Sequence, residues 1–571
     1  MGCIDNLIID KAALHEAHNR KKNLSCTWID VKKAFDSINH KWLDLCLEMH
    51  NIPHKIRRFI VSTMKSWSIT LEIRTSNNKE YIGPIQLKQG ILQGDSFCVR
   101  LFTLCLNPIA WWLRCTEGYT FSHGTKEKLT HLLYVDDLKT YSKSASKATI
   151  LAKTLKDMFQ DIGLTWGMDK CAGVDLVRGK LQHTQDTNLS ANEKLKMLDE
   201  TDTYKFLGKF ENSKQLEDQV FEETSREYLK RLSVIWTSNI SIPRKIRGTN
   251  TFALPVLQYQ MWTGDWTIDG LKTLDRRTRE IIKDNGGMHK SESTKLLYLP
   301  SSLGGSGLKS VEDTYKVTTI KAANYINNST DTRIKLVRSF EKLKAEEGRK
   351  SVFKQATKYA LEYNIECTFT ETGTLLTTES KTTQVNLASP RAIKDTLSKA
   401  VIKKISEELH QQKWLGDLTT KQHQDLNISD NTHQIHTTWK NVPDIVCSVN
   451  KTIRQQLLPT KTYYETKLLK QVLDKRCRMC NTSTESTTHV MCACSRIAQT
   501  LYKARHDKLL RPLYHYLLYK YRFQESDHSK PWYQQRLPEG KIENDHAKIL
   551  WDVPFYLERA PKDGANKPDI A

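Results

Sequence analysis

Two adjacent aspartates, Asp136 and Asp137, lie between apolar, β-prone runs in the stretch 129–142. This pattern indicates a hairpin with two carboxylates at its tip, where like charges repel and a structural turn usually has Asn-Gly or Asp-Gly. A third carboxylate, Asp30, closes the strand-like segment 24–31. An aspartate at the end of a buried strand is costly unless it is paired or bound to metal. Carboxylates that converge from separate strands can hold two Mg²⁺ ions about 3.5–4 Å apart, as nucleotidyl transfer requires.

A glycine-containing loop, residues 88–97, lies between these carboxylates in the sequence. Gly90 and Gly94 flank Gln93 and would let the backbone approach a ligand closely before a helix begins. Asp95 follows at the expected start of that helix. Taken alone, the pattern is equally typical of a simple turn.

Together, in this order, the segments resemble the palm of reverse transcriptases. The resemblance implies that Asp30 and Asp136 bind two Mg²⁺ ions, with Asp137 supporting them. It also implies substrates: an RNA template, a DNA primer and dNTPs. The matching segments are DVKKAFDSINH (30–40), QGILQGDS (89–96), YVDD (134–137), DIGLTWGMDKCAG (161–173) and YKFLGKF (204–210).

Three further roles follow from the resemblance. Phe35 takes the steric-gate position, where an aromatic ring excludes a ribose 2′-hydroxyl. Gln93, Gly94 and Asp95 belong to the nucleotide- and template-binding side. Lys170 matches a basic residue near the departing pyrophosphate, although the asparagine usual three residues earlier is Gly167 here.

The composition fits a nucleic-acid partner. The 571 residues carry a formal net charge of +22, and a large basic protein usually binds a polyanion. No apolar run of bilayer length and no signal-peptide core is expected, so no membrane partner is predicted. The 13 cysteines are mostly scattered and are expected to be reduced, so a cluster of them indicates metal binding.

The cysteine cluster supplies a candidate zinc site. Cys477-x2-Cys480-x8-His489-x4-Cys494 offers three thiolates and one imidazole, enough for one tetrahedral Zn²⁺. Cys492 competes with Cys494 for the fourth position. The spacing of the family prefers Cys494.

The chain beyond the palm resembles non-LTR retrotransposons that carry a restriction-enzyme-like endonuclease. Residues 251–266, 274–280 and 297–308 resemble their thumb, and 549–571 resembles the opening of a PD-(D/E)xK nuclease, with Pro568 and Asp569 as its first signature pair. The second acid and the lysine of that nuclease are not in the chain, so we expect no DNA cleavage. Only part of the fingers precedes Asp30, and the proline usual near residue 99 is Val99.

The sequence therefore predicts an α+β fold, a right-hand polymerase palm with truncated fingers. A Thr-rich stretch, 368–384, is polar, has no helical period and is the best linker candidate. The predicted domains are truncated fingers and palm (1–210), helical thumb (211–330), basic helical and Thr-rich linker (331–450), zinc knuckle (451–500) and partial endonuclease (501–571).

The leading hypothesis is an RNA-directed DNA polymerase that extends a nicked target DNA on an RNA template. A nucleic-acid-binding relic that has lost catalysis is the alternative, and a group II intron maturase fits less well because it lacks this knuckle. The family resemblance places the protein in the nucleus after synthesis in the cytoplasm. The sequence leaves the target site, RNA specificity and oligomeric state open.

Overall fold

A computed structural model describes residues 2–75, 78–122, 127–379, 381–386, 390–412, 444–523, 534 and 538–551. The chain divides into a larger unit, residues 1–288, 294–411 and 429–441, and a smaller unit, residues 289–293, 412–428 and 442–571. Each unit is described by itself. Pro568 and Asp569 lie outside the described residues.

The larger unit is built on one mixed sheet in the order β12-β13-β10-β1-β8-β7, with β11 beside β10. The central strand β1 is buried along its whole length and pairs antiparallel with β8 and β10. This confirms the buried strand predicted before Asp30. The strands are β1 (Leu24–Ile29), β7 (His131–Tyr134), β8 (Asp137–Ser142), β10 (Ala172–Val177), β11 (Lys180–Leu181), β12 (Thr187–Asn188) and β13 (Lys194–Met197).

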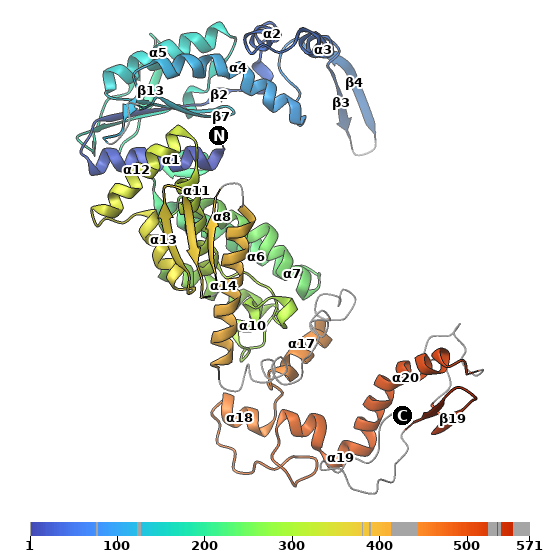
Figure 1. Cartoon of the computed structure of the whole chain (residues 1–571). Coiled ribbons are helices and arrows are strands. Elements are labelled where there is room, and N and C mark those ends of the chain that lie inside the picture. Colours follow the sequence, from blue (N-terminus) through green and yellow to red (C-terminus); the bar gives the residue numbers. More distant parts are fainter. Residues whose placement is uncertain are drawn as a thin grey trace. The chain divides into compact units, whose positions relative to one another are not determined.

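One face of the sheet is covered by helices α2, α4 and α5, as Figure 1 shows. The segment after Asp30 does not enter a helix at once. A short 3₁₀ turn, Phe35–Ser37, comes first, and Asn39 then caps α2 by accepting a hydrogen bond from the Lys41 amide. The bounds are α2 (His40–Met49), α3 (His54–Lys65), α4 (Ser96–Cys115) and α5 (Ala145–Asp161).

The helix α4 corrects the expectation that no segment has the length and hydropathy of a membrane span. Its mean hydropathy over an 18-residue window is 1.3. Phe102, Cys105 and Leu106 on α4 are buried in the core against the sheet. The apolar character of α4 is thus explained by packing inside the unit.

The other face of the sheet is covered by α1, and a long series of helices shares one hydrophobic core with α1 and the sheet. The mainly helical region predicted after residue 210 is confirmed, while its assignment as a thumb stays a prediction. The helices are α1 (Cys3–Asn19), α6 (Glu217–Thr237), α7 (Ile242–Gly248), α8 (Leu254–Met261), α9 (Ile268–Asp284), α10 (Thr294–Tyr298), α11 (Val311–Asn328), α12 (Thr332–Glu346), α13 (Val352–Leu361) and α14 (Pro390–His410).

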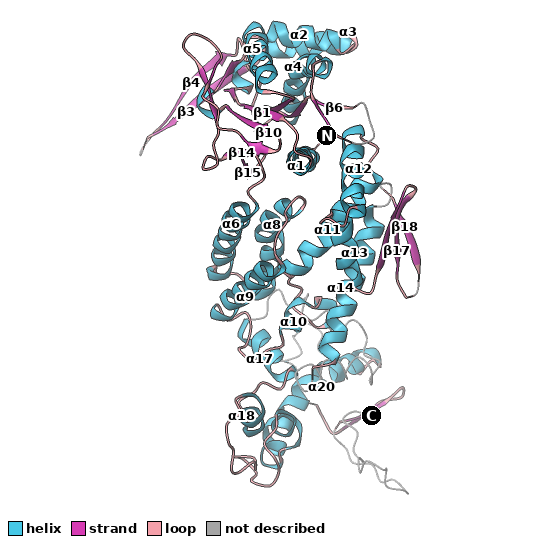
Figure 2. Cartoon of the chain, turned by 90° about the vertical axis from the view of Figure 1, so that its left-hand side faces the viewer, coloured by secondary structure: helices cyan, strands magenta, loops and turns pink. Residues whose placement is uncertain are grey.

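The Thr-rich stretch 368–384 is not a linker. It forms most of a three-stranded antiparallel sheet, β16 (Glu366–Thr370), β17 (Gly373–Thr377) and β18 (Thr382–Val385), visible beside α13 in Figure 2. Cys367, Leu376 and Val385 from this sheet are buried in the same core as the helices. Threonine is β-branched and fits a pleated, half-buried surface, which the linker interpretation overlooked.

Four two-stranded antiparallel pairs complete the described part of the larger unit. β14 (Tyr204–Phe206) pairs with β15 (Lys209–Glu211), and β3 (Ser68–Arg74) pairs with β4 (Lys79–Gln86). Every residue of β3 and β4 is exposed. The remaining pairs are β2 (Val31–Lys32) with β9 (Thr165–Trp166) and β5 (Tyr119–Thr120) with β6 (Lys128–Leu129).

The smaller unit contains the cysteine cluster and a small core formed by α20 with a terminal hairpin. Tyr514, Leu518 and Trp551 are among the buried residues of that core. Its elements are α17 (Asp444–Arg454), α18 (Lys461–Lys467), α19 (Ser495–Ile497), α20 (Lys503–Lys520), β19 (Lys541–Glu543) and β20 (Lys548–Leu550).

Candidate functional site

The register of the central strands brings the predicted carboxylates to one end of the sheet. Ile29 on β1 pairs with Leu138 on β8, so the next residues outward, Asp30 and Asp137, lie opposite each other. On the other side of β1, the pairing with β10 places Lys170 at the same end, and its Nζ is 3.9 Å from Asp30 Oδ2. Three strand ends therefore contribute charged side chains to one place.

Asp136 reaches this place through a tight turn. Tyr134 pairs with Asp137, which leaves Val135 and Asp136 as a two-residue hairpin loop. Val135 has a φ of 59°, an uncommon conformation for a β-branched residue. Such strain persists only where the surrounding structure imposes it, and it is common at functional sites. The turn presents two consecutive carboxylates where a simple hairpin would have glycine.

Burial and neighbouring negative charges raise the pKa values of two of these carboxylates, Asp137 and Asp30. Burial, followed by the charges of Asp136 and Asp30, raises the pKa of Asp137 to about 6. Burial also raises the pKa of Asp30, where the effect of Asp136 and Asp169 opposes that of Lys170. Like charges held together in a partly buried site are stabilised by a cation. The geometry therefore fits divalent metal binding, with oxygen donors of the kind that Mg²⁺ prefers.

Two neighbouring residues complete the site and were missed from the sequence. Asp169 adds a fourth carboxylate close enough to affect the pKa of Asp30, and its position beside Lys170 was the available signal. Gly167 explains the departure from the family pattern. A Cβ at this position would lie 2.8 Å from Asp30 Oδ2, so a larger residue would displace the carboxylate.

The predicted nucleotide-side residues lie on two adjoining segments. The Phe35 ring stacks on Phe102 with centroids 4.6 Å apart. The Ile91 amide donates to the Phe35 carbonyl at 2.9 Å, and Gln93 Nε2 donates to Asp36 Oδ1 at 3.0 Å. The loop is thus tied to the segment that follows Asp30.

The two glycines of that loop are required for different physical reasons. A Cβ on Gly90 would lie 2.8 Å from the Asp36 carbonyl oxygen, so the close approach requires glycine. Gly94 has a φ of 95° and open space around it. Asp95 caps α4, because its Oδ1 accepts from the Phe97 amide at 2.9 Å. Its carboxylate therefore has a structural role in addition to the predicted one.

The smaller unit brings four potential metal ligands together. The ligand atoms of Cys477, Cys480, His489 and Cys494 all lie within 4.8 Å of one another. The sequence left the fourth ligand open between Cys492 and Cys494. Burial favours Cys494, because Cys494 is fully buried and Cys492 is exposed. Three sulfurs and one imidazole at these separations fit a tetrahedral zinc site.

Local hydrogen bonds prepare this cluster for metal. Hydrogen bonds from Thr482 and the Ser483 amide lower the pKa of Cys480 to about 5, so the thiolate predominates at neutral pH. The Cys477 amide donates to the Ser483 carbonyl at 2.7 Å. This hydrogen bond closes the loop that carries Cys477 and Cys480. Arg478 and Glu485 brace the same loop through a double hydrogen bond.

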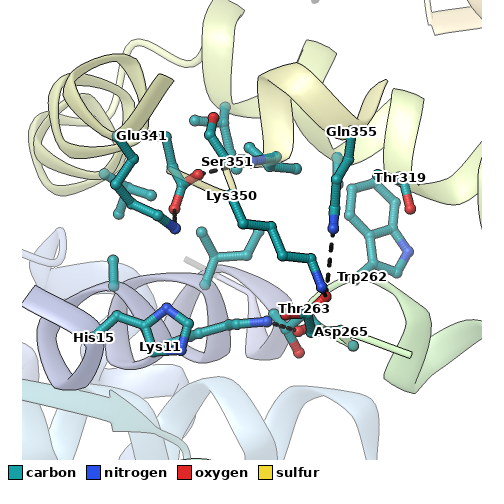
Figure 3. A pocket seen from close by; sticks show the side chains of 18 of the residues that line it. Lys11, His15, Trp262, Thr263, Asp265, Thr319, Glu341, Lys350, Ser351 and Gln355 are labelled. Carbon is teal, nitrogen blue, oxygen red and sulfur yellow. Dashed lines mark hydrogen bonds and ion pairs between the residues drawn. The ribbon is translucent and has the colours of Figure 1, made fainter. Parts of the chain in front are cut away.

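A separate cavity of about 280 Å³ lies between α1, α12 and the segment after α8, as Figure 3 shows. Its charged side chains are paired within the chain: Lys350 with Asp265, and Lys344 with Glu341 at 2.8 Å. None of the residues that line it was predicted as a site residue. The carboxylates at the strand ends differ from these paired side chains, because they lie beside other carboxylates.

Comparison with known families agrees with this geometry. Residues 2–209 match the family described as reverse transcriptase (RNA-dependent DNA polymerase). The chain carries a reverse transcriptase domain. All the predicted polymerase-site residues fall within this domain.

The chain is also similar to Pol polyproteins of R2 elements, in keeping with the predicted resemblance to non-LTR retrotransposons. The chain is 21% identical over 316 residues to the Pol polyprotein of retrotransposable element R2DM of Drosophila melanogaster, covering 54% of this chain and 29% of that protein. For R2 polyproteins of Nasonia vitripennis and Popillia japonica the values are 27% over 217 residues (37% and 20%) and 23% over 339 residues (58% and 54%). The chain thus spans about half or less of these relatives.

Telomerase structures also align with this chain. Those of Candida tropicalis, without and with a fragment of telomeric RNA, cover 59% and 60% of this chain and 55% and 52% of theirs, at 12% identity. Their TM-scores are 0.28 and 0.27, and at such values the likeness carries no weight for the fold.

Proposed function

We propose that this chain is an RNA-directed DNA polymerase that extends a DNA primer on an RNA template. The supporting observation is the convergence of Asp30, Asp136 and Asp137 at one end of the sheet. Burial, together with neighbouring carboxylate charges, raises the pKa values of Asp30 and Asp137, which indicates a site that a divalent cation would stabilise. When bound, Mg²⁺ supplies activation of the primer 3′-hydroxyl and charge neutralisation on the pyrophosphate.

The chain's own residues hold and select the reactants. Asp30 and Asp136 hold the cations, and Asp137 keeps the turn charged beside them. The Phe35 ring, fixed by its stack on Phe102, excludes a ribose 2′-hydroxyl and so favours dNTPs. The side chain of Lys170 is 68% exposed, so its ammonium can meet the departing pyrophosphate.

The loop residues and the basic surface serve the nucleic acid. Gln93 and Gly94 border the segment that carries Phe35, which supports a role beside the nucleotide and template. The net charge of +22 supports binding of RNA and DNA phosphates. By analogy with the site-specific elements that it resembles, the enzyme would prime synthesis at a target DNA in the nucleus.

We further propose one structural Zn²⁺ at Cys477, Cys480, His489 and Cys494. Metal analysis of the purified chain should give about one zinc per chain. Cys480→Ser should lose that zinc, whereas Cys492→Ser, which changes an exposed cysteine outside the cluster, should retain it. Equal zinc in both variants would contradict this ligand set.

The proposed start of an endonuclease, including Pro568 and Asp569, rests on the sequence resemblance alone.

Primer extension on an RNA template, with Mg²⁺ and dNTPs, tests the polymerase function. The wild type should extend the primer, and Asp136→Ala should not. Asp157→Ala, which removes an exposed carboxylate from α5, is the matched control and should extend normally. If the wild type binds RNA and DNA without extending the primer, the alternative function, a nucleic-acid-binding relic, is the correct one.

A further inference from the structure

A lysine is completely buried beneath the strand-end carboxylates. Lys139 lies on β8, two residues after Asp137, and its side chain is 0% exposed. Its Nζ lies 2.6 Å from Asp10 Oδ1 and 2.8 Å from Glu211 Oε1, and both of these carboxylates are also 0% exposed. Lysine is almost never fully buried unless it is paired.

This cluster, Lys139 with Asp10 and Glu211, joins three separate elements. Lys139 belongs to the catalytic strand β8, Asp10 to α1 and Glu211 to β15. The hydroxyl of Tyr141 donates to Asp10 Oδ1 at 2.6 Å, and Trp28 Nε1 donates to Glu211 Oε1 at 2.6 Å. The ammonium also lies over the Trp28 ring, 4.6 Å from its centroid.

The charges of the cluster are set by one cation between two acids. Burial disfavours the ionised form of Asp10, but Lys139 and the hydrogen bonds around Asp10 outweigh it and lower the pKa of Asp10. Burial and the charge of Asp10 raise the pKa of Glu211 well above its usual range. Lys139 therefore supplies the cation between two buried acids, and its loss would leave negative charge buried without a partner.

The cluster and the metal-binding carboxylates share the same strands. Side chains two residues apart in a strand point to the same face. Trp28 precedes Asp30 by two residues on β1, just as Lys139 follows Asp137 by two on β8. Any shift of either side chain is therefore transmitted along a short, rigid strand to a carboxylate.

The hairpin held by Glu211 also reaches the site. Its first residue, Tyr204, stacks on Trp28 with centroids 4.9 Å apart. Burial and the charges of Asp30 and Asp137, among others, raise the pKa of Tyr204, which indicates that its hydroxyl is near both. At the other side, Asn6 of α1 donates to the Leu133 carbonyl, next to the turn, at 3.2 Å.

We propose that Lys139, held by Asp10 and Glu211, is a positioning residue that fixes β1 and β8 so that Asp30, Asp136 and Asp137 converge on the metal. This inference rests on the proposed polymerase function. Lys139 touches no reacting atom. It acts by joining α1, β8 and the β14–β15 hairpin into one support.

The decisive variant removes every charge of the cluster while keeping its shape: Lys139→Met, Asp10→Asn and Glu211→Gln together. A purely structural cluster should be replaceable in this way, because a buried ion pair is often exchangeable for neutral groups. Mn²⁺ binding to the chain is measured without nucleic acid, from the decrease of the EPR signal of free Mn²⁺. This measurement does not depend on catalysis. Primer extension gives kcat and the KM for dNTP separately.

We expect the triple variant to fold but to bind Mn²⁺ about tenfold more weakly and to lose about 10²-fold in kcat, since small misplacements of catalytic groups cost this much. KM for dNTP should change by less than about threefold, because the hydrogen bonds of the cluster go to Trp28 and Tyr141 and not to Phe35, Gln93 or Lys170. Wild-type values for Mn²⁺ affinity and kcat in the folded variant would overturn the proposal.

A milder variant covers the case in which the triple variant does not fold. Tyr141→Phe removes only the hydroxyl that holds Asp10, and should weaken Mn²⁺ binding about threefold, in keeping with one lost hydrogen bond to a charged group. Unchanged Mn²⁺ affinity in this variant would also overturn the proposal. Mn²⁺ binding by the wild type without primer extension would refute the polymerase function alone, and a wild type that binds no Mn²⁺ would refute both.

Discussion

Two acidic clusters adjoin strand β8 of the sheet, and they differ in the cation that lies beside them. In the buried cluster, Lys139 supplies a cation and the pKa of Asp10 is lowered in spite of burial. At the strand ends, the nearest cation is the exposed Lys170 at 3.9 Å, and the pKa of Asp137 is raised to about 6. The comparison indicates that a carboxylate cluster paired with a buried lysine stabilises the fold. A carboxylate cluster whose lysine is exposed is suited to binding a cation.

The largest expected effect separates activity from stability. Asp30→Asn should lower kcat by about 10³-fold or more, because a two-metal site loses several kcal/mol of transition-state stabilisation with a ligand. The free energy of unfolding should stay equal or rise, since a repelling charge is removed. Primer extension and urea unfolding measure the two quantities.

Asp157→Asn on the exposed face of α5 is the control and should change neither quantity. A large loss of stability in Asp30→Asn would show that the strand-end carboxylates are a structural cluster like the buried one.

In the buried cluster, unlike at the strand ends, loss of a charged side chain should lower the free energy of unfolding. Lys139→Met leaves two buried acids without their cation and should lower the free energy of unfolding by about 3–5 kcal/mol. The matched control, Lys147→Met, breaks the exposed pair with Glu117, whose side chains are 47% and 57% exposed, and should cost less than about 1 kcal/mol. Urea unfolding of both variants measures the difference. Equal effects would mean that burial does not distinguish the two pairs.

The strand-end site was predictable because its signals are local. A buried strand before Asp30 and a hairpin with Asp136 and Asp137 at its tip follow from runs of apolar, β-prone residues. The closed cysteine cluster follows from spacing, except that burial was needed to separate Cys492 from Cys494.

The buried cluster was not predictable from the same kind of pattern. Lys139 stands in a strand where a lysine usually faces solvent, and its partners Asp10 and Glu211 are far away in sequence. The Thr-rich sheet was missed for a related reason: its burial depends on helices from distant segments. Contacts between distant residues override what a local pattern indicates.

The pH dependence of metal binding sharpens the comparison at the strand ends. Because the pKa of Asp137 is about 6, its carboxyl takes up a proton as the pH falls through 6. Mn²⁺ binding should therefore weaken from pH 7 to pH 5. In Asp137→Asn this part of the pH dependence should be absent. EPR titrations with Mn²⁺ at several pH values measure it.

The stability of the metal-free chain should also depend on the protonation of Asp137, but in the opposite direction: stability should fall as the pH rises. The pKa of Asp137 is raised in the folded state, so its contribution to stability is present below pH about 4 and is lost as the pH rises through about 6. The difference in unfolding free energy between the wild type and Asp137→Asn should fall over this window. A difference independent of pH would contradict the raised pKa.

The smallest expected effect concerns the space around Asp30. Gly167→Ala would place a Cβ 2.8 Å from Asp30 Oδ2, and the backbone of Gly167, with φ −80° and ψ 80°, accepts alanine. The carboxylate must move by a few tenths of an ångström, so kcat should fall about tenfold with little change in stability. Gly248→Ala, where the nearest atom is an ordinary 3.4 Å away in a helical conformation, is the control and should be silent. Wild-type kcat in Gly167→Ala would mean that Asp30 tolerates displacement, and that the strand ends need less rigid support than the buried cluster provides.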